Sequence, residues 1–355
     1  MKHIFILLLL TGFFQAFAQD DSEFFESKVT INGYGEVHYN NIKVDNAPLK
    51  EEFDFHRFVL FIGYAWNEKW SLKSELELEH NLVRSGQGYL QLEQAYIEFR
   101  PSQHFGIQGG VLLVGAGLLN EYHEPVNFFG VERPEYNQVI IPTTWFGTGL
   151  GISGLYEGFD YKLMMIEGIN PKNIVKGTGI RDGRQKGYRA DPAGFMYNAK
   201  VDYVSIPGLR VGASFTYNNA KVDTVENLIQ LAEVHARYKN NNIMASFEYG
   251  NLSLGSGDVE AARGGYIDAG YNVSSLFNIK WDIYPFIRYS DYNAVAKSRS
   301  GNTTDEQRFH FSEIRFGFNI YPISDIVLKF DYLIKERELN SLKTNAFNLG
   351  IGYQF

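Results

Sequence analysis

The sequence predicts an all-β protein, a transmembrane antiparallel up-and-down β-barrel of about 16 strands with short turns at one end and long loops at the other. Apolar residues alternate with polar or small ones in many short stretches, and short and long connections alternate along the chain. After residue 18, no apolar run approaches the ~18 residues that a membrane helix needs. A mean hydropathy of -0.23 agrees with a barrel, because lipid-facing and interior residues average out.

Residues 1–18 have the pattern of a secretory signal peptide. Lys2 and His3 form a basic head, residues 4–14 are mostly apolar, and Ala16-Phe17-Ala18 is an A-x-A cleavage site. The apolar run is too short to cross a bilayer of roughly 30 Å. We therefore expect an exported protein in which residues 19–27 form a short periplasmic segment and residues 28–355 form the barrel.

The expected strands are recognised by their two-residue period. In residues 326–334, Ile326, Phe330 and Ile334 fall on one face, whereas Lys329 and Asp331 fall on the other. Most strands should have the length of a tilted membrane strand, roughly 9–11 residues. The clearest ones are expected at residues 70–82, 209–217, 243–249, 280–292, 314–320 and 326–334.

The last eleven residues, 345–355, have the same alternation. Phe347, Leu349, Ile351, Tyr353 and Phe355 occupy every second position. The stretch resembles the closing strand of bacterial outer-membrane β-barrels. In that class, this C-terminal pattern is also read by the barrel-assembly machinery, so the resemblance implies this machinery as a partner through Phe355.

The connections fall into two classes. Short turns are expected at residues 67–69, 101–103, 158, 206–208, 240–242 and 322–324, and longer polar stretches at 40–52, 116–144, 169–192, 219–228, 253–263, 293–306 and 337–344. Outer-membrane barrels have tight periplasmic turns and long extracellular loops. Trp66, Trp70 and Trp281 lie next to short turns, as expected for a periplasmic aromatic girdle. A soluble β-sandwich is the alternative, but its turns would not sort by length in this way.

The polar faces of the strands would line the interior. Because an unpaired ion in a dry core costs several kcal/mol, so many charges favour a water-filled channel. Ion pairs that only stiffen the wall are the alternative for most of them. The run of Glu75, Glu77 and Glu79 should need cations such as Arg57 nearby. The predicted pore-lining residues are Arg57, Lys73, Glu75, Glu77, Glu79, Glu98, Lys200, Arg210, Arg237, Arg288 and Arg315.

The longest connection, residues 116–144, is the third loop by count. It retains apolar residues such as Phe128 and Phe129, which favours folding into the barrel, where it would constrict the pore. A surface loop packed on its neighbours is the alternative. If the loop constricts, its acidic excess favours cations or neutral solutes. The predicted constriction residues are Glu121, His123, Glu124, Glu132, Arg133 and Glu135.

The fourth loop is rich in basic residues: Lys172, Lys176, Arg181, Arg184, Lys186 and Arg189. Such a cluster could bind lipopolysaccharide phosphates or draw anions to the channel mouth. A solvated loop without a ligand is the other interpretation.

Residues 92–100 (L-E-Q-A-Y-I-E-F-R), residues 105–110 (F-G-I-Q-G-G), Glu124-Pro125 and residues 130–134 (G-V-E-R-P) resemble the phosphate-selective porin O/P family, in the divergent form found in Bacteroidetes-type bacteria. The spacing is loosened by an insertion of Val111 to His123. The resemblance implies a porin. It does not carry over phosphate selectivity, because this chain mixes acids with bases where that family uses a ladder of arginines and lysines.

We therefore expect an outer-membrane porin for passive diffusion of small hydrophilic solutes or ions, with selectivity set by the third loop and the charged wall. A non-conducting barrel that serves as a receptor, assembly or secretion partner is the alternative. Outer-membrane lipid and lipopolysaccharide are expected partners, and a homotrimer is left open, with the glycines around Gly147 and Gly151 as a contact face.

No enzymatic activity, cofactor or metal is expected. The chain has no cysteine, and His310 with Ser312 lacks a nucleophile elbow. A net charge of -8 argues against nucleic acid.

Overall fold

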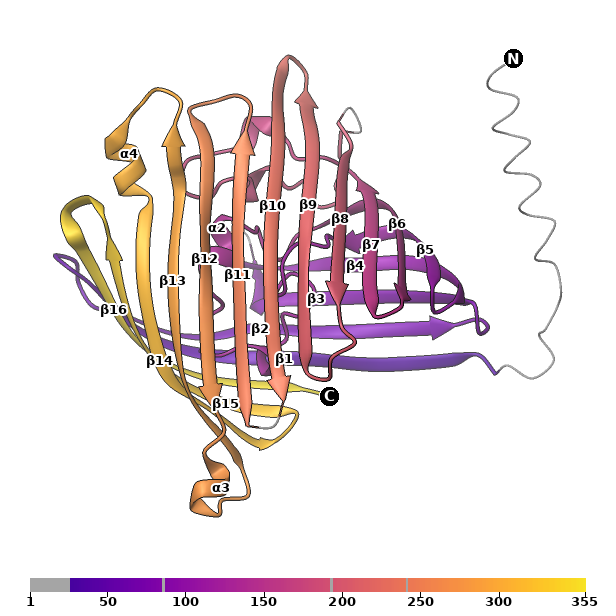
Figure 1. Cartoon of the computed structure of the whole chain (residues 1–355), viewed down its shortest axis with the longest axis horizontal. Coiled ribbons are helices and arrows are strands. Elements are labelled where there is room, and N and C mark those ends of the chain that lie inside the picture. Colours follow the sequence, from indigo (N-terminus) through magenta and orange to yellow (C-terminus); the bar gives the residue numbers. More distant parts are fainter. Residues whose placement is uncertain (1–25, 85–86, 192–193, 241) are drawn as a thin grey trace.

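The protein is a closed antiparallel β-barrel of sixteen strands, seen in the computed structural model (Figure 1). The structure describes residues 26–84, 87–191, 194–240 and 242–355. The predicted signal peptide and most of segment 19–27 lie outside these residues. Each strand pairs with its neighbours in the sequence, and β1 closes the barrel on β16. The predicted fold class is confirmed.

The sixteen strands differ in length, and the shortest are the four consecutive strands β5 to β8. Their bounds are β1 (Lys28–Val44), β2 (Lys50–Ala65), β3 (Trp70–Arg84), β4 (Gln87–Ser102), β5 (Phe105–Leu113), β6 (Phe146–Tyr156), β7 (Phe159–Ile166), β8 (Met196–Tyr203), β9 (Leu209–Val222), β10 (Val225–Asn240), β11 (Ile243–Leu254), β12 (Val259–Tyr271), β13 (Asp282–Ser298), β14 (His310–Ile323), β15 (Ile326–Arg337) and β16 (Leu342–Gln354).

Alternation along each strand separates the outer wall from the interior. In β16, Phe347 and Ile351 are 44% and 50% exposed, whereas Asn348 between them is buried. The same parity gives an outer wall of exposed aliphatic and aromatic side chains around the barrel. A continuous apolar wall of this kind suits hydrocarbon, and the closed ladder leaves no unpaired strand edge. Among the described residues, no helix is long and apolar enough to cross a membrane.

Several connections differ from their predicted extents because the strands continue into polar sequence. The stretches expected as loops at 40–52 and 219–228 are mostly strand, and the actual connections are residues 45–49 and 223–224. Polar residues there still pair across the ladder, for example Asn41 with Glu51 and Lys221 with Glu226. A strand that projects into water needs no apolar face, so hydropathy alone places its end too early.

One connection at the short-turn end is longer than predicted. Residues 272–281 join β12 to β13 and contain the short helix α3 (Ser274–Phe277), the lowest element in Figure 1. At the other end, residues 299–309 contain α4 (Thr303–Arg308). Two connections are much longer, and we call residues 114–145 the third loop and residues 167–195 the fourth loop.

Candidate functional site

The third loop lies inside the barrel and contacts strands on opposite sides of it. After β5, the Glu121 carboxylate accepts hydrogen bonds from Lys162 on β7 and Lys200 on β8, each at 2.7 Å. Further along, the backbone N–H of Val131 donates to Asp331 on β15 at 2.6 Å, and Arg288 on β13 donates to the carbonyl of Phe129 at 2.7 Å. The loop therefore crosses the interior.

The loop turns at the far wall at Gly130. This residue has a φ of +75°, and a Cβ added there would lie 3.0 Å from the Arg315 side chain. Glycine adopts this left-handed conformation without the steric cost that other residues incur. Next to the turn, Phe129 stacks on Phe286 of β13, with ring centroids 4.9 Å apart and the planes at 4°. Glycine and aromatic packing together fix the point at which the loop meets the wall.

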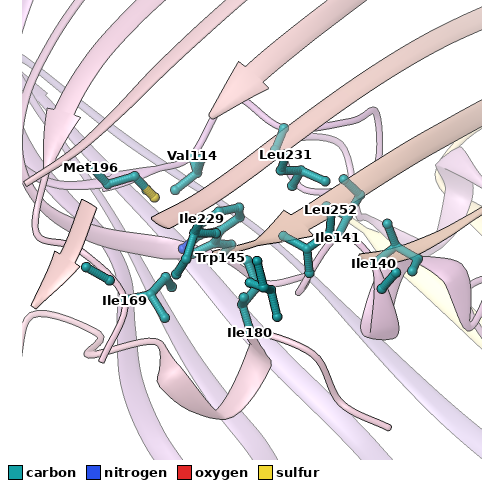
Figure 2. Close-up of a cluster of buried hydrophobic side chains, with 14 of the residues drawn as sticks. Val114, Ile140, Ile141, Trp145, Ile169, Ile180, Met196, Ile229, Leu231 and Leu252 are labelled. Atoms are coloured by element: carbon teal, nitrogen blue, oxygen red, sulfur yellow. The ribbon is translucent and has the colours of Figure 1, made fainter. Parts of the chain in front are cut away.

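Apolar residues of both loops pack with interior residues of β4, β5 and β7 to β13 (Figure 2). We call this packed region the apolar side. Trp145 of the third loop is 1% exposed and lies at its centre. Burial of this many apolar side chains anchors both loops to one side of the barrel. The labelled members are Val114, Ile140, Ile141, Trp145, Ile169, Ile180, Met196, Ile229, Leu231 and Leu252.

The interior faces of β1 to β4 carry mainly charged residues, and we call them the charged side. Buried ionisable residues, such as Glu233, Glu248 and Arg288, also lie on the interior faces of β10 to β13. Arg57 on β2 lies between two carboxylates, 2.8 Å from Glu36 and 3.1 Å from Glu77. Arg57 therefore opposes part of the acidic run on β3, as the sequence predicted. Glu75 has no such partner among the described lysines and arginines. It lies 3.4 Å from Nε2 of His123 in the third loop.

The predicted pore-lining residues separate into two groups. Most are almost fully buried and ion-paired, for example Arg288 with Asp268 at 2.9 Å and Arg315 with Asp331 at 2.6 Å. The remainder are more exposed. The buried group is Arg57, Glu75, Glu77, Glu98, Lys200, Arg288 and Arg315, and the more exposed group is Lys73, Glu79, Arg210 and Arg237.

The acidic residues predicted for the constriction are largely neutralised. Glu132 lies 3.0 Å from His38, and Glu135 pairs with Lys335 and accepts from Tyr292. Glu124 accepts from Asn127 at 2.6 Å. Burial alone would raise the pKa of Glu121, but Lys162 and Lys200 outweigh it and hold that pKa well below its ordinary value. The acidic excess of the third loop is thus not available to select cations.

Three basic residues of the fourth loop, Arg181, Arg184 and Lys186, are partly buried and face the interior, whereas Lys172, Lys176 and Arg189 are exposed. Arg184 donates to the carbonyl of Pro142 at 2.7 Å and also to that of Thr144, and Arg181 donates to that of Thr143. Lys186 donates to Gln91 of β4 at 3.2 Å. Burial, and then the neighbouring Arg181, lower the pKa of Arg184 to about 10. These cations support the third loop through neutral carbonyl and amide oxygens.

Three cavities lie against the third loop, and two of them approach it from opposite ends of the barrel. One, of about 230 Å³, opens toward the loops and is lined by Glu79, Arg133, Arg181, Arg184 and Lys186 among others. The other, of about 390 Å³, lies toward the short turns. The two share no lining residue. Along β3 and β4, buried Glu75 and Glu93 lie between residues that line one cavity and residues that line the other. Together with buried His123, Tyr34 and Val59 we call them the buried layer.

Sequence reasoning missed several interior residues because β-bulges change the strand parity. The ladder slips between Glu36 and Val37 opposite His56, and between Glu75 and Leu76 opposite Glu93. Each bulge turns two successive side chains inward, so His56 joins Arg57 and Glu93 joins Gln94. No feature of strict alternation could have located these two bulges.

Two further expectations are changed by the geometry. The side-chain positions of Gly147 and Gly151 face Glu167 and Leu112 respectively, on the interior side, so these glycines do not form an outer contact face. His310 lies between Glu338 at 2.5 Å and Asp291 at 3.1 Å, rather than being directed to Ser312.

Comparisons with solved structures support the fold. No protein-family model matches the chain, so the resemblance to the phosphate-selective porin O/P family stays a prediction. An uncharacterized protein of Aquifex aeolicus (strain VF5) is 29% identical over 92% of this chain and 80% of its own length. The anion-selective porin from Comamonas acidovorans covers 93% of this chain and 100% of its own, with a TM-score of 0.63 and 11% identity. The match to OmpT of Vibrio cholerae in its trimer form covers 93% of this chain and 100% of the OmpT chain, with a TM-score of 0.60 and 12% identity. The chain has the barrel fold of these outer-membrane proteins.

Proposed function

We propose that the protein is an outer-membrane porin through which small hydrophilic solutes diffuse along the charged side of the barrel. The observation that carries the proposal is the asymmetric interior. The third loop packs on the apolar side, and the loop-end cavity lies between this loop, the fourth loop and the charged side. The cavity toward the short turns is lined by residues from β3 to β9, including Lys162, Lys200 and Arg210. A packed apolar region excludes water, whereas a wall of charges stabilises it.

The solute class that suits the loop-end cavity is a small anion. Within the described residues, no carboxylate forms an ion pair with Arg133, Arg181, Arg184 or Lys186, all of which line this cavity. Of the carboxylates that line it, Glu36 and Glu77 are paired with Arg57, and Glu132 lies 3.0 Å from His38. Glu79 is the one lining carboxylate without an ion pair among the described residues, against four such cations. The uncompensated charge is therefore positive, and it should raise the local concentration of anions. This reverses the cation preference expected from the loop composition.

Planar-bilayer recordings of the folded protein under a KCl gradient test the proposal. Steady single-channel conductance with an anion-leaning reversal potential is expected. Lys186→Gln should shift that potential toward cations. Lys172→Gln is the matched control, because Lys172 lies in the same loop but pairs with exposed Asp223 and lines none of these cavities. A wild-type reversal potential that indicates cation selectivity would contradict the proposed anion preference.

A second candidate function is a barrel that binds a partner without conducting. The buried layer between the two cavities favours it, since the cavities share no lining residue. A correctly folded protein that shows no conductance at any voltage would replace the porin proposal with this one.

The location and partners follow from the same proposal. A signal peptide at residues 1–18, insertion by the barrel-assembly machinery and contact with outer-membrane lipid and lipopolysaccharide would place the barrel in a bacterial outer membrane. A homotrimer is proposed by analogy with the trimer form of the matched OmpT. No covalent chemistry is proposed.

A further inference from the structure

Three side chains from three separate segments meet in the buried layer between the two cavities. Glu75 comes from β3, Glu93 from the bulge in β4 and His123 from the third loop, and each is 2% exposed or less. Nε2 of His123 lies 3.4 Å from Oε1 of Glu75 and 3.5 Å from Oε2 of Glu93. All three atoms lie within 4.8 Å of one another.

These three atoms are also the ones that lack hydrogen-bond partners. Oε1 of Glu75, Oε2 of Glu93 and Nε2 of His123 are all buried without one. Among the described residues, the ion-pair partner of both carboxylates is His123, and nearby Arg57 is already engaged by Glu36 and Glu77. Two buried carboxylates require positive charge, and a divalent cation supplies it in full when His123 is neutral.

The opposite side of each group is held in the orientation that a metal ligand needs. Nδ1 of His123 lies 3.3 Å from the backbone carbonyl of Asn120, which fixes the proton on Nδ1 and leaves the Nε2 lone pair facing the carboxylates. Gln94 donates to the second oxygen of Glu75 at 2.6 Å, and Gln91 donates to that of Glu93 at 3.1 Å. This is the outer arrangement typical of histidine and carboxylate ligands.

The separations also fit a metal better than a shared proton. Bonds of 2.0–2.2 Å in a tetrahedral site place neighbouring ligand atoms about 3.3–3.6 Å apart. Both distances from Nε2 fall in this range. Next to the site, the ring of Tyr34 packs edge-on against His123 with centroids 5.9 Å apart, and its hydroxyl is buried without a partner. A fourth ligand position can be taken by water or by a neighbouring hydroxyl.

We propose that Glu75, Glu93 and His123 bind one divalent first-row transition ion, with Zn²⁺ as the representative, and that this ion ties the third loop to the charged side of the barrel. Imidazole nitrogen with carboxylate oxygens suits Zn²⁺ and its first-row neighbours better than Ca²⁺ or Mg²⁺, which prefer oxygen ligands alone.

A second histidine cluster nearby is a weaker metal site. His56 is shared by two groups of nearby ligand atoms, one with His38 and Glu132 and one with Asp54 and His80. Both nitrogens of His56 are already engaged, Nε2 by Arg57 at 2.7 Å and Nδ1 by Asp54 at 3.0 Å. His56→Gln is therefore a matched control that removes a histidine from the interior but leaves the proposed site intact.

The test is Zn²⁺ binding by the folded, detergent-solubilised full-length protein after chelator treatment, with stoichiometry from elemental analysis and affinity from competition with a fluorescent chelator. We expect one Zn²⁺ per chain. His123→Gln and Glu93→Gln should each abolish binding or weaken it about tenfold or more, and Gln94→Met should weaken it about tenfold. His56→Gln should bind like the wild type.

Co²⁺ gives an independent readout, because a tetrahedral site with nitrogen and oxygen ligands produces visible absorption that His123→Gln should remove. Should His123→Gln not fold, Gln94→Met supplies the same comparison. Failure of the wild type to bind Zn²⁺ at micromolar free metal, or wild-type binding by His123→Gln, would overturn the site and leave a protonated histidine between the carboxylates. Neither outcome depends on conductance, so the porin proposal stands or fails separately.

Discussion

The two sides of the barrel interior are built from different chemistry although the same kind of strand forms both. On the apolar side, Leu231 and Leu252 of the wall are buried under Trp145 of the third loop. On the charged side, the wall offers Glu36, Arg57, Glu75 and Glu77, and the third loop reaches it mainly through His123 and Glu132. One side therefore anchors the loop, and we propose that the other forms the path for solutes.

The largest effect should come from breaking the apolar side. Trp145→Ala removes a buried aromatic ring from the centre of the cluster and should lower the free energy of unfolding by about 3–5 kcal/mol. The loop should also loosen, so single-channel conductance should rise and become noisier. Urea unfolding in lipid vesicles measures the first effect. Trp66→Ala is the matched control at an exposed position of the outer wall, and it should lower the free energy of unfolding by clearly less. Equal losses in the two variants would show that the apolar side does not anchor the loop.

A smaller effect should come from one ion pair where the loop meets the wall. Glu121→Gln keeps the shape of the side chain but leaves Lys162 and buried Lys200 without their shared carboxylate. We expect a loss of about 1–3 kcal/mol, because buried Lys200 then keeps only the more distant carboxylate of Asp202, at 3.7 Å. The pKa of Glu121 is held low, so its contribution should be complete above the ordinary pKa and be lost only as pH falls through the lowered one. The free energies of unfolding of the wild type and the variant should therefore become equal at acidic pH. A difference that persists there would contradict the assignment.

The charge of the loop-end cavity should depend on pH at the alkaline end. Burial and the neighbouring Arg181 lower the pKa of Arg184 to about 10, and burial with Arg184 lowers that of Lys186. Both bases are charged below their lowered pKa values and neutral above them. Anion preference should thus be stable near neutral pH and decline as pH rises toward about 10. Reversal potentials recorded over this range measure the decline, and Lys186→Gln should show less of it. An anion preference that increases with pH would oppose this account.

Much of the fold could be predicted because two-residue alternation is a local property. The facing of Phe347, Asn348 and Ile351 in β16 follows from sequence alone. The interior could be predicted only in part. Phe128 and Phe129 indicated that the third loop folds inward, but the surface that receives Phe129 includes Gly270, where any Cβ would lie 2.5 Å from its ring. This fit between Phe129 and Gly270 involves segments that are far apart in the sequence, so no local sequence pattern reveals it.

The candidate site shows the same limit. The two-residue alternation of β3 predicted that Glu75 faces the interior. Glu93, however, faces the interior because of a bulge in β4, and the alternation pattern does not reveal where a bulge occurs. The third loop does contain more acidic than basic residues. It does not present that negative charge to a solute, because most of its carboxylates pair with Lys162, Lys200, His38 and Lys335. Net charge in a loop is thus a poor guide to the charge a solute meets.

We propose that solutes pass on the charged side and are excluded from the apolar side. Because the chain has no cysteine, single cysteines can be placed without background. Glu79→Cys lies in the loop-end cavity, and Leu252→Cys lies at a fully buried position of the apolar side. Exposure to a membrane-impermeant anionic thiol reagent, followed by mass analysis and conductance, should modify Glu79→Cys rapidly and alter its conductance while leaving Leu252→Cys unmodified. Rapid modification of Leu252→Cys together with an unreactive Glu79→Cys would contradict the account.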